Sequence, residues 1–155
     1  MTWEYVAGFV DGEGAIVKRN RGYVLFISQT NFEVLDKVHE FIGKGSIYSI
    51  TKRKSHWKDA WVFSSRSSEN THYILTKIVD KLIVKKRQAS KAIRELEKRF
   101  EEIQKQRNIR ENRATKVRKL RSRGLTYREI GRILKIDFGY ARRLSRLGKK
   151  EKWWA

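Results

Sequence analysis

The spacing of apolar residues switches between two periods along the first 90 residues, and this restricts the fold more than any other feature. Apolar residues three and four positions apart predict amphipathic helices, while alternation of apolar and polar residues predicts strands. The expected helices span 3–10, 32–42 and 69–84, and the expected strands span 15–19, 23–29, 46–52 and 60–65. The order is α-β-β-α-β-β-α, so the sequence predicts an α+β domain with two hairpins.

Local signals support these boundaries. Thr2, Asn31 and Ser68 each stand just before a helical pattern, where a side-chain oxygen caps the first free amides. Gly12 and Gly14 are expected to end the first helix. A long polar helix is expected at 88–110, and its apolar stripe packs on its own domain, forms a dimer contact or belongs to a stiff spacer.

The charge of the chain indicates a polyanionic partner. The 155 residues carry a formal net charge of +20, and residues 87–155 hold 23 Lys and Arg against 8 Asp and Glu. Nucleic acid is the first candidate, because clustered cations gain affinity by releasing counterions from phosphates. A membrane surface comes second, and a basic protein without a specific partner comes third.

Composition excludes several kinds of site. The chain has no cysteine, which removes disulfides and thiolate-metal sites, and its three histidines stand far apart. No apolar run reaches the length of a membrane span, and no signal-peptide pattern is present, so we expect a soluble, intracellular protein. With the charge, this favours a DNA-associated protein, for which neither a membrane nor a small-molecule substrate is expected. The sequence does not distinguish bacterial or phage cytoplasm from an organelle.

The stretch VAGFVDGEG, residues 6–14, combines apolar side chains, glycines and two acids. Gly8 and Gly12 lie four residues apart, a spacing that lets two helix backbones approach closely. Asp11 and Glu13 fall where the helix dipole disfavours carboxylates, so a cation is expected nearby. The alternative is a glycine-rich turn with solvated acids.

The stretch resembles the signature of the LAGLIDADG homing endonucleases. Ala7, Gly8, Asp11 and Gly14 match that signature, and the expected order of helices and strands over about residues 3–100 is also similar to the family's. The resemblance implies a curved, four-stranded antiparallel sheet and a magnesium-dependent double-strand DNA endonuclease, in which Mn²⁺ is expected to substitute for Mg²⁺. Because the chain has one such motif, it implies a homodimer that reads a roughly palindromic site.

The resemblance also implies site residues. Glu13, with Gly12 beside it, would hold the metal, and Gln29 and Lys85 would complete the catalytic set, with Lys86 as the alternative to Lys85. Gln29 is otherwise a strand-end cap, and Lys85 is otherwise a phosphate contact. The implied dimer interface consists of Val6, Gly8, Phe9 and Gly12.

In the implied complex the outer face of the sheet lies on DNA, and alternation along the strands assigns its residues. The expected DNA contacts there are Val17, Arg19, Arg21, Val24, Phe26, Ser28, Tyr48, Ile50, Lys52, Arg53 and Lys54. Apolar members of this set can touch thymine methyl groups.

Residues 125–144 resemble a helix-turn-helix, with Thr126 and Asp137 as caps and Lys135 where a turn glycine is usual. A preceding helix at 114–123 would complete a three-helix unit. The expected organisation is an endonuclease domain at 1–100, a helical linker at 101–113, a helix-turn-helix domain at 114–148 and a tail at 149–155. Expected base contacts are Phe138, Gly139, Tyr140, Arg142 and Arg143, and expected phosphate contacts are Arg128, Arg132 and Arg146.

These features together predict a site-specific homing endonuclease. Two other functions use similar scaffolds: a transcription regulator that lacks the catalytic acids, and an intron-splicing maturase that binds host-intron RNA. The presence of Glu13, Gln29 and Lys85 argues against the regulator.

Overall fold

The structure, a computed structural model, describes residues 1–51, 56 and 58–147. The chain divides into two compact units, Met1–Arg99 and Phe100–Ala155. No helix in the described part is both long enough and apolar enough to cross a membrane.

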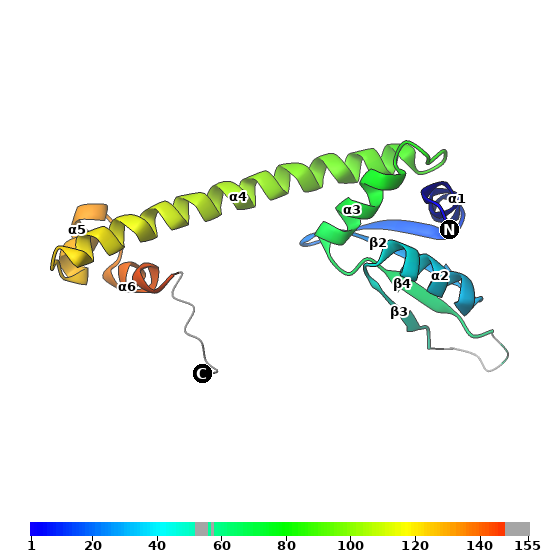
Figure 1. The fold of residues 1–155 in the computed structure, drawn as a ribbon, viewed down its shortest axis with the longest axis horizontal. Coiled ribbons are helices and arrows are strands. Elements are labelled where there is room, and N and C mark those ends of the chain that lie inside the picture. The colour runs from blue at the N-terminus through cyan, green and yellow to red at the C-terminus, as the bar shows by residue number, and fades with distance from the viewer. Residues whose placement is uncertain (52–55, 57, 148–155) are drawn as a thin grey trace. The chain divides into compact units, whose positions relative to one another are not determined.

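The N-terminal unit has the expected α+β architecture, and the predicted order of its elements is confirmed (Figure 1). Its elements are α1 (Trp3–Glu13), β1 (Gly14–Arg19), β2 (Gly22–Gln29), α2 (Phe32–Ile42), β3 (Ser46–Ser49), β4 (Trp61–Ser64), α3 (Ser68–Ile78) and the first turns of α4 (Lys86–Ser122). The four strands form an antiparallel sheet in the order β1-β2-β4-β3.

Strand alternation sorts the sheet into two faces, as predicted. Ile16, Tyr23, Leu25 and Ile27 are at most 6% exposed and form the core face together with Phe63. The other face, called the open face below, carries the intervening residues of the strands: Ala15, Val17, Arg19, Val24, Phe26, Ser28, Ser46, Tyr48, Val62 and Ser64.

Helix α1 is longer than expected. Thr2 caps it by accepting from the Tyr5 amide at 3.3 Å, as predicted, but Gly12 does not end it, and the helix continues to Glu13. An interior glycine costs a helix only about 1 kcal/mol, which the packing of α1 offsets. The helix ends at Gly14, where a Cβ would lie 2.6 Å from the Val10 carbonyl oxygen.

Helix α3 is shifted and shorter than expected. Ser67, not Ser68, caps it, accepting from the Asn70 amide at 3.1 Å, while the Ser68 hydroxyl donates to the Arg21 carbonyl. The helix stops at Ile78 instead of continuing to position 84. The amides of residues 83–85 instead donate to a carboxylate of α1, which keeps this segment out of the helix.

The second hairpin is also shorter than predicted. Paired residues run from Ser46 opposite Ser64 to Ser49 opposite Trp61, and one further bond joins the Ile50 amide to the Ala60 carbonyl at 2.8 Å. Ile50 therefore lies just beyond β3.

The first turns of α4 close the core over the β1–β2 hairpin. Glu95 accepts from the Lys18 ammonium at 2.7 Å and the Tyr23 hydroxyl at 2.9 Å, and Gln88 donates to the Ile16 carbonyl at 2.9 Å. Leu96 is buried in the same region. Hydrogen bonds from Lys18 and Tyr23 lower the pKa of the Glu95 carboxyl.

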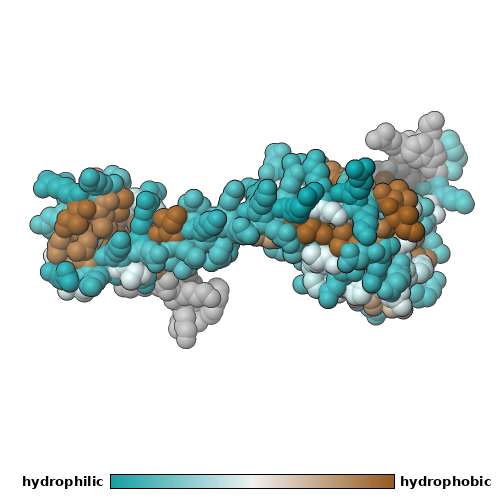
Figure 2. Space-filling view, turned by 90° about the horizontal axis from the view of Figure 1, so that it is seen from above, coloured by the Kyte–Doolittle hydropathy of each residue, from teal (hydrophilic) through white to brown (hydrophobic). Residues whose placement is uncertain are grey.

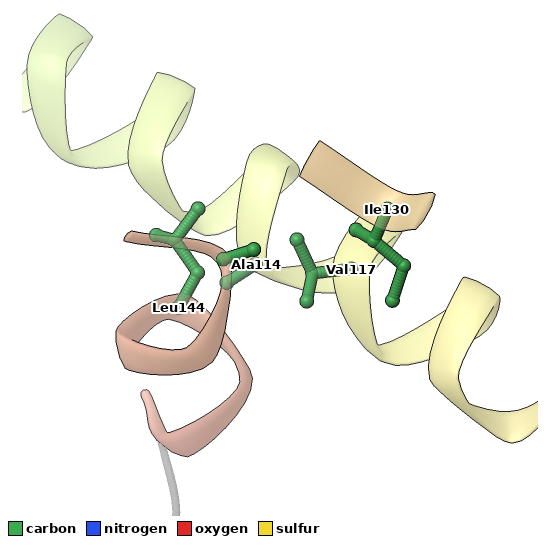
Figure 3. Packing of buried hydrophobic residues seen from close by; sticks show 5 residues of the cluster. Ala114, Val117, Ile130 and Leu144 are labelled. Atoms are coloured by element: carbon green, nitrogen blue, oxygen red, sulfur yellow. The ribbon is translucent and has the colours of Figure 1, made fainter. Parts of the chain in front are cut away.

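The C-terminal unit contains the rest of α4, α5 (Tyr127–Leu134) and α6 (Phe138–Arg146). Figure 3 shows its core, in which Ala114 and Val117 of α4 meet Ile130 of α5 and Leu144 of α6. The two helices expected at 88–110 and 114–123 are one continuous helix, because residues 111–113 include neither proline nor glycine to interrupt it.

Three residues, Lys135 to Asp137, join α5 to α6. Thr126 and Glu129 form a capping box on α5, and Asp137 caps α6, accepting from the Tyr140 amide at 3.0 Å. A Cβ on Gly131 would lie 2.8 Å from the Ile136 carbonyl oxygen, so the close approach of the turn requires glycine there. Lys135 takes the left-handed conformation, with φ 51°.

Candidate functional site

One side of α1 has no neighbour among the residues of its own chain that the structure describes. Gly8 and Gly12 are exposed, and a Cβ built on either glycine meets no atom within 4 Å. Tyr5 and Phe9 flank the glycines and stack on each other, with ring centroids 6.0 Å apart. This glycine face, defined by Tyr5, Gly8, Phe9 and Gly12, can therefore accept another helix at short distance.

Val6 does not belong to the glycine face. It is fully buried in the core of its own unit, as are Ala7 and Val10. Of the four residues expected at a dimer interface, the structure thus leaves Gly8, Phe9 and Gly12 outside the core, and Tyr5 replaces Val6 beside them.

The two acids at the end of α1 have different surroundings. Asp11 accepts from the backbone amides of Ile83 at 2.6 Å, Val84 at 3.2 Å and Lys85 at 2.9 Å. Burial acts to raise the pKa of the Asp11 carboxyl, but these amides and the Lys85 charge outweigh it and hold the pKa below its ordinary value. Asp11 is therefore a structural carboxylate, and the protein itself supplies the positive partners that its place at a helix C-terminus requires.

Glu13 is the acid left exposed at the end of α1. Lys85 lies close to this helix end, because its ammonium donates to the main-chain carbonyl of Asp11. The side chain of Lys85 is half-buried, so its approach to α1 is constrained by the fold. The structure thus brings two of the expected catalytic residues to one helix terminus.

Gln29 lies at the same end of the sheet. Gly14, which follows Glu13, pairs with Ile27 of β2, and Gln29 is two positions further along that strand. Its Oε1 accepts from the Thr30 amide at 2.8 Å and from the Thr30 hydroxyl at 3.3 Å. These bonds match the strand-end cap that the sequence left open as the alternative role.

The ligands available for a metal at the end of α1 are few. Among the described residues no group of three or more His, Cys, Asp or Glu side chains could hold an ion. Glu13 and the Gly12 carbonyl offer hard oxygen ligands, which suit Mg²⁺ in kind, but Asp11 is engaged by the loop before α4. The donor set fits a divalent metal only if further oxygen ligands come from another molecule.

The open face of the sheet carries a mixture of apolar and cationic residues. Val17, Val24 and Phe26 are half-buried, and the Arg19 guanidinium lies 5.8 Å from the Phe26 ring centroid. Other expected DNA contacts, namely Arg21, Ser28, Tyr48 and Ile50, are exposed. Lys52, Arg53 and Lys54 lie outside the described residues.

The C-terminal unit presents cations around its turn and along α6. Arg128, Arg132 and Lys135 line a shallow hollow together with Phe138, which is 56% exposed. A second hollow is lined by Asp137, Gly139, Arg142, Arg143 and Arg146. Tyr140 is half-buried and packs on the core of the unit, which leaves it less available to a ligand than the arginines.

Sequence reasoning missed the role of Asp11. It treated both acids as candidates for a cation, and nothing in the sequence marks residues 83–85, which lie 72 to 74 positions away, as the partners of Asp11. The exposed pair Ile83 and Val84, 88% and 75% exposed, was also not predicted.

No protein-family model and no curated protein matches the sequence. Among solved structures, the chain is similar to the homing endonuclease I-CvuI in complex with DNA, with 22% identity, a TM-score of 0.49 and 61% of this chain covered. The match spans 65% of the I-CvuI chain, slightly less than two thirds of its length.

Two other solved structures are similar. The archaeal intron-encoded homing endonuclease I-Vdi141I, complexed with DNA, shows 21% identity and a TM-score of 0.47 over 96% of this chain and 84% of its own. The LAGLIDADG meganuclease I-CpaMI, bound to uncleaved DNA, shows 18% identity and a TM-score of 0.49 over 76% of this chain and 43% of its own. Similarity at these levels does not transfer an activity to this chain.

Proposed function

We propose that two copies of this chain form a magnesium-dependent, site-specific DNA endonuclease of the LAGLIDADG homing type. The observation that carries the proposal is the end of α1, where the exposed carboxylate of Glu13 lies next to an uncovered glycine face and near the constrained ammonium of Lys85. A stability role does not account for an exposed acid at a helix C-terminus, because the helix dipole disfavours it there.

The glycine face supplies the reason for two copies. Each chain contributes one exposed acid at the end of α1, and cutting both strands of a duplex requires two active carboxylates. Packing of α1 against α1 through Gly8 and Gly12 places the two Glu13 residues on either side of a twofold axis. A twofold protein reads a roughly palindromic DNA site.

The chemistry follows from the types of residue present. Glu13, with the Gly12 carbonyl, would hold Mg²⁺, which when bound neutralises phosphate charge and lowers the pKa of a bound water. The Lys85 ammonium adds positive charge where the phosphate enters. The Gln29 amide can orient water from the end of β2 if its Oε1 exchanges Thr30 for a water molecule. Mn²⁺ is expected to replace Mg²⁺, since it prefers similar oxygen ligands.

DNA binding is divided between the two units. The open face supplies Arg19 and Arg21 for phosphates, and Val17, Val24 and Phe26 for apolar contact with bases. In the C-terminal unit, α6 would enter a major groove from its N-terminal end, as the second helix of a helix-turn-helix does, with Arg142 and Arg143 near base edges.

The proposal is tested by selecting the target and then removing the acid. Wild-type protein with Mg²⁺ is incubated with a library of duplexes with randomised sequence, and the fragments cut on both strands are sequenced to identify the site. Glu13→Gln should bind that site with similar affinity and should not cut it, because a neutral amide cannot hold a hard cation as a carboxylate does.

The matched control is Glu4→Gln. Glu4 is an exposed acid in the first turn of the same helix, paired with Lys81 at 3.0 Å, and it should be dispensable for cleavage. Cutting by Glu13→Gln at close to the wild-type rate would refute the assignment. Sequence-specific binding without any cleavage by the wild-type protein would favour a transcription regulator instead.

A further inference from the structure

Four cations form a line along the first turns of α4. Arg87, Lys91, Arg94 and Lys98 recur at spacings of four, three and four residues, which places them on one side of a helix. All four are exposed. Together they are called the α4 stripe.

Among the described residues of α4 before Phe100, the acids reach the α4 stripe only through a charge interaction between Glu95 and Lys91. The two acids of α4 before Phe100 are Glu95 and Glu97, and both turn toward the domain. Glu95 accepts from Lys18 and Tyr23, while Glu97 accepts from His72 at 3.3 Å. No residue of the stripe forms an ion pair within the part of the chain that the structure describes.

The stripe faces away from the core. The residues of α4 that are buried in the N-terminal unit are Ala89, Ala92 and Leu96, and a turn of 100° per residue puts them on the side of the helix opposite the stripe. Figure 2, seen from above, shows hydrophilic side chains along α4. Glu95 in this part of α4 bonds to Tyr23, whose side chain lies on the core face of the sheet, so the stripe is separate from the open face.

The chemistry of the stripe fits the backbone of a duplex. Neighbouring stripe residues are about 5 Å apart along the helix axis, close enough to neutralise successive phosphates of one strand. The stripe contains no aromatic residue, so it lacks the stacking platforms that proteins use to bind the unpaired bases of single strands. A convex row of long cationic side chains reads no base edges, and its binding is therefore independent of sequence.

We propose that the α4 stripe binds the sugar-phosphate backbone of a second DNA duplex while the open face holds the target. The presence of a target duplex on the open face rests on the proposed function. The affinity of the stripe for duplex DNA does not depend on it. An enzyme with both surfaces can hold one duplex and sample another.

The first test compares salt dependence. Wild-type protein and R87Q/K91Q/R94Q/K98Q are titrated with a 30-base-pair duplex of random sequence at several salt concentrations. Loss of four phosphate contacts should reduce the slope of log K against log salt by about 3 to 4 units. The matched control K37Q/K44Q/K58Q/K77Q removes four exposed cations that are scattered over the N-terminal unit, and it should change the slope by clearly less. Equal slopes in the wild type and the stripe variant, or equal losses in both variants, would overturn the proposal.

The second test locates the contact on the protein. Acetylation of lysine side chains, read by mass spectrometry, should fall at Lys91 and Lys98 when the duplex is added. Single-stranded RNA of the same length should protect them less. Unchanged reactivity at both lysines, or protection by RNA with none by duplex, would refute a duplex-binding stripe. Glu13→Gln should give the same protection of Lys91 and Lys98, because duplex binding by the stripe does not require cleavage. The acetylation result therefore tests the stripe even if the wild-type protein does not cut DNA.

Discussion

At the residue scale, the Asp11 carboxylate joins two segments that are 72 to 74 positions apart in the chain. It caps the three amides before α4, and it holds the segment whose next side chain, Lys85, reaches the end of α1. Glu13 and Asp11 differ by two positions in sequence, yet one is exposed and the other is anchored. Both residues are carboxylates, so their chemistry alone does not assign one to structure and the other to catalysis. The hydrogen bonds that Asp11 accepts from backbone amides assign it to structure.

Replacement of Asp11 by Ala should destabilise the N-terminal unit. The free energy of unfolding should fall by about 1–2 kcal/mol, because three backbone amides lose their acceptor. Chemical denaturation followed by circular dichroism measures this. Asp36→Ala, which removes an exposed acid from the surface of α2, is the control and should change stability by less than about 0.5 kcal/mol.

The contribution of Asp11 should also depend on pH. Its pKa is lowered in the folded state, so its stabilising effect is present above the ordinary aspartate pKa and is lost as pH falls through the lowered value. The stability difference between wild type and Asp11→Ala should therefore be larger at pH 7 than at pH 3. An equal difference at both pH values would show that the charge of Asp11 contributes nothing.

Lys135 is the second residue with a clear energetic consequence. A lysine with φ 51° occupies a conformation that glycine adopts without steric cost. Lys135→Gly should raise the free energy of unfolding of the C-terminal unit by up to about 1 kcal/mol.

Gly131→Ala, four residues earlier, should lower the free energy of unfolding of the same unit, since the added Cβ would press on the Ile136 carbonyl. Hydrogen exchange of the α5 and α6 amides reports both changes locally.

At the element scale, the glycine face of α1 allows a test that separates folding from assembly. No neighbour of α1 in the described part of the chain lies within 4 Å of a Cβ at Gly8, so Gly8→Ala should keep the fold and stabilise α1 slightly. Gly8→Leu should prevent dimerisation, because its side chain separates two helices packed through glycine. Light scattering with and without the target DNA measures the oligomer. A wild-type protein that stays monomeric on its site would contradict the shared-centre arrangement.

The elements also show how far sequence reasoning reaches. Alternation along β2 and the caps at Thr2, Asn31 and Asp137 depend on neighbouring residues, so they were predicted correctly. The conformation of residues 83–85 depends on the remote contact with Asp11, which no local pattern marks. Continuity of α4 was missed because its polar middle gives no apolar periodicity to follow. The catalytic roles of Glu13, Gln29 and Lys85 remain predictions.

At the scale of the whole molecule, most of the net positive charge lies in a different part of the sequence from the candidate catalytic residues. Residues 107–155 hold 17 Lys and Arg against 4 acids. A chain ending at Ile103 should still cut at high concentration, but it should bind more weakly and lose discrimination only at the outer base pairs. Its salt slope should fall by about one unit for each phosphate contact removed. An unchanged slope and unchanged outer preference would mean that the C-terminal unit does not bind the target.

Single substitutions on α6 refine that test. Arg142→Ala or Arg143→Ala in the full chain should relax the preference at one outer position by about 1–3 kcal/mol if that arginine reads a guanine. Binding to sites altered one base pair at a time measures the effect. Loss of affinity that is uniform over all sites would assign the arginine to a phosphate instead.

The closure of the β1–β2 hairpin by α4 has a consequence for synthesis of the chain. Gln88, Glu95 and Arg99 bond to residues 16, 18, 20 and 23, so the core is sealed by the last part of its unit to be translated. While a ribosome still holds residues 86–99, β1 is an edge strand that α1 contacts but that lacks the bonds from α4. Nascent chains stalled before Arg99 should therefore bind chaperones and resist native folding, whereas release of the next few residues completes the unit in one cooperative step.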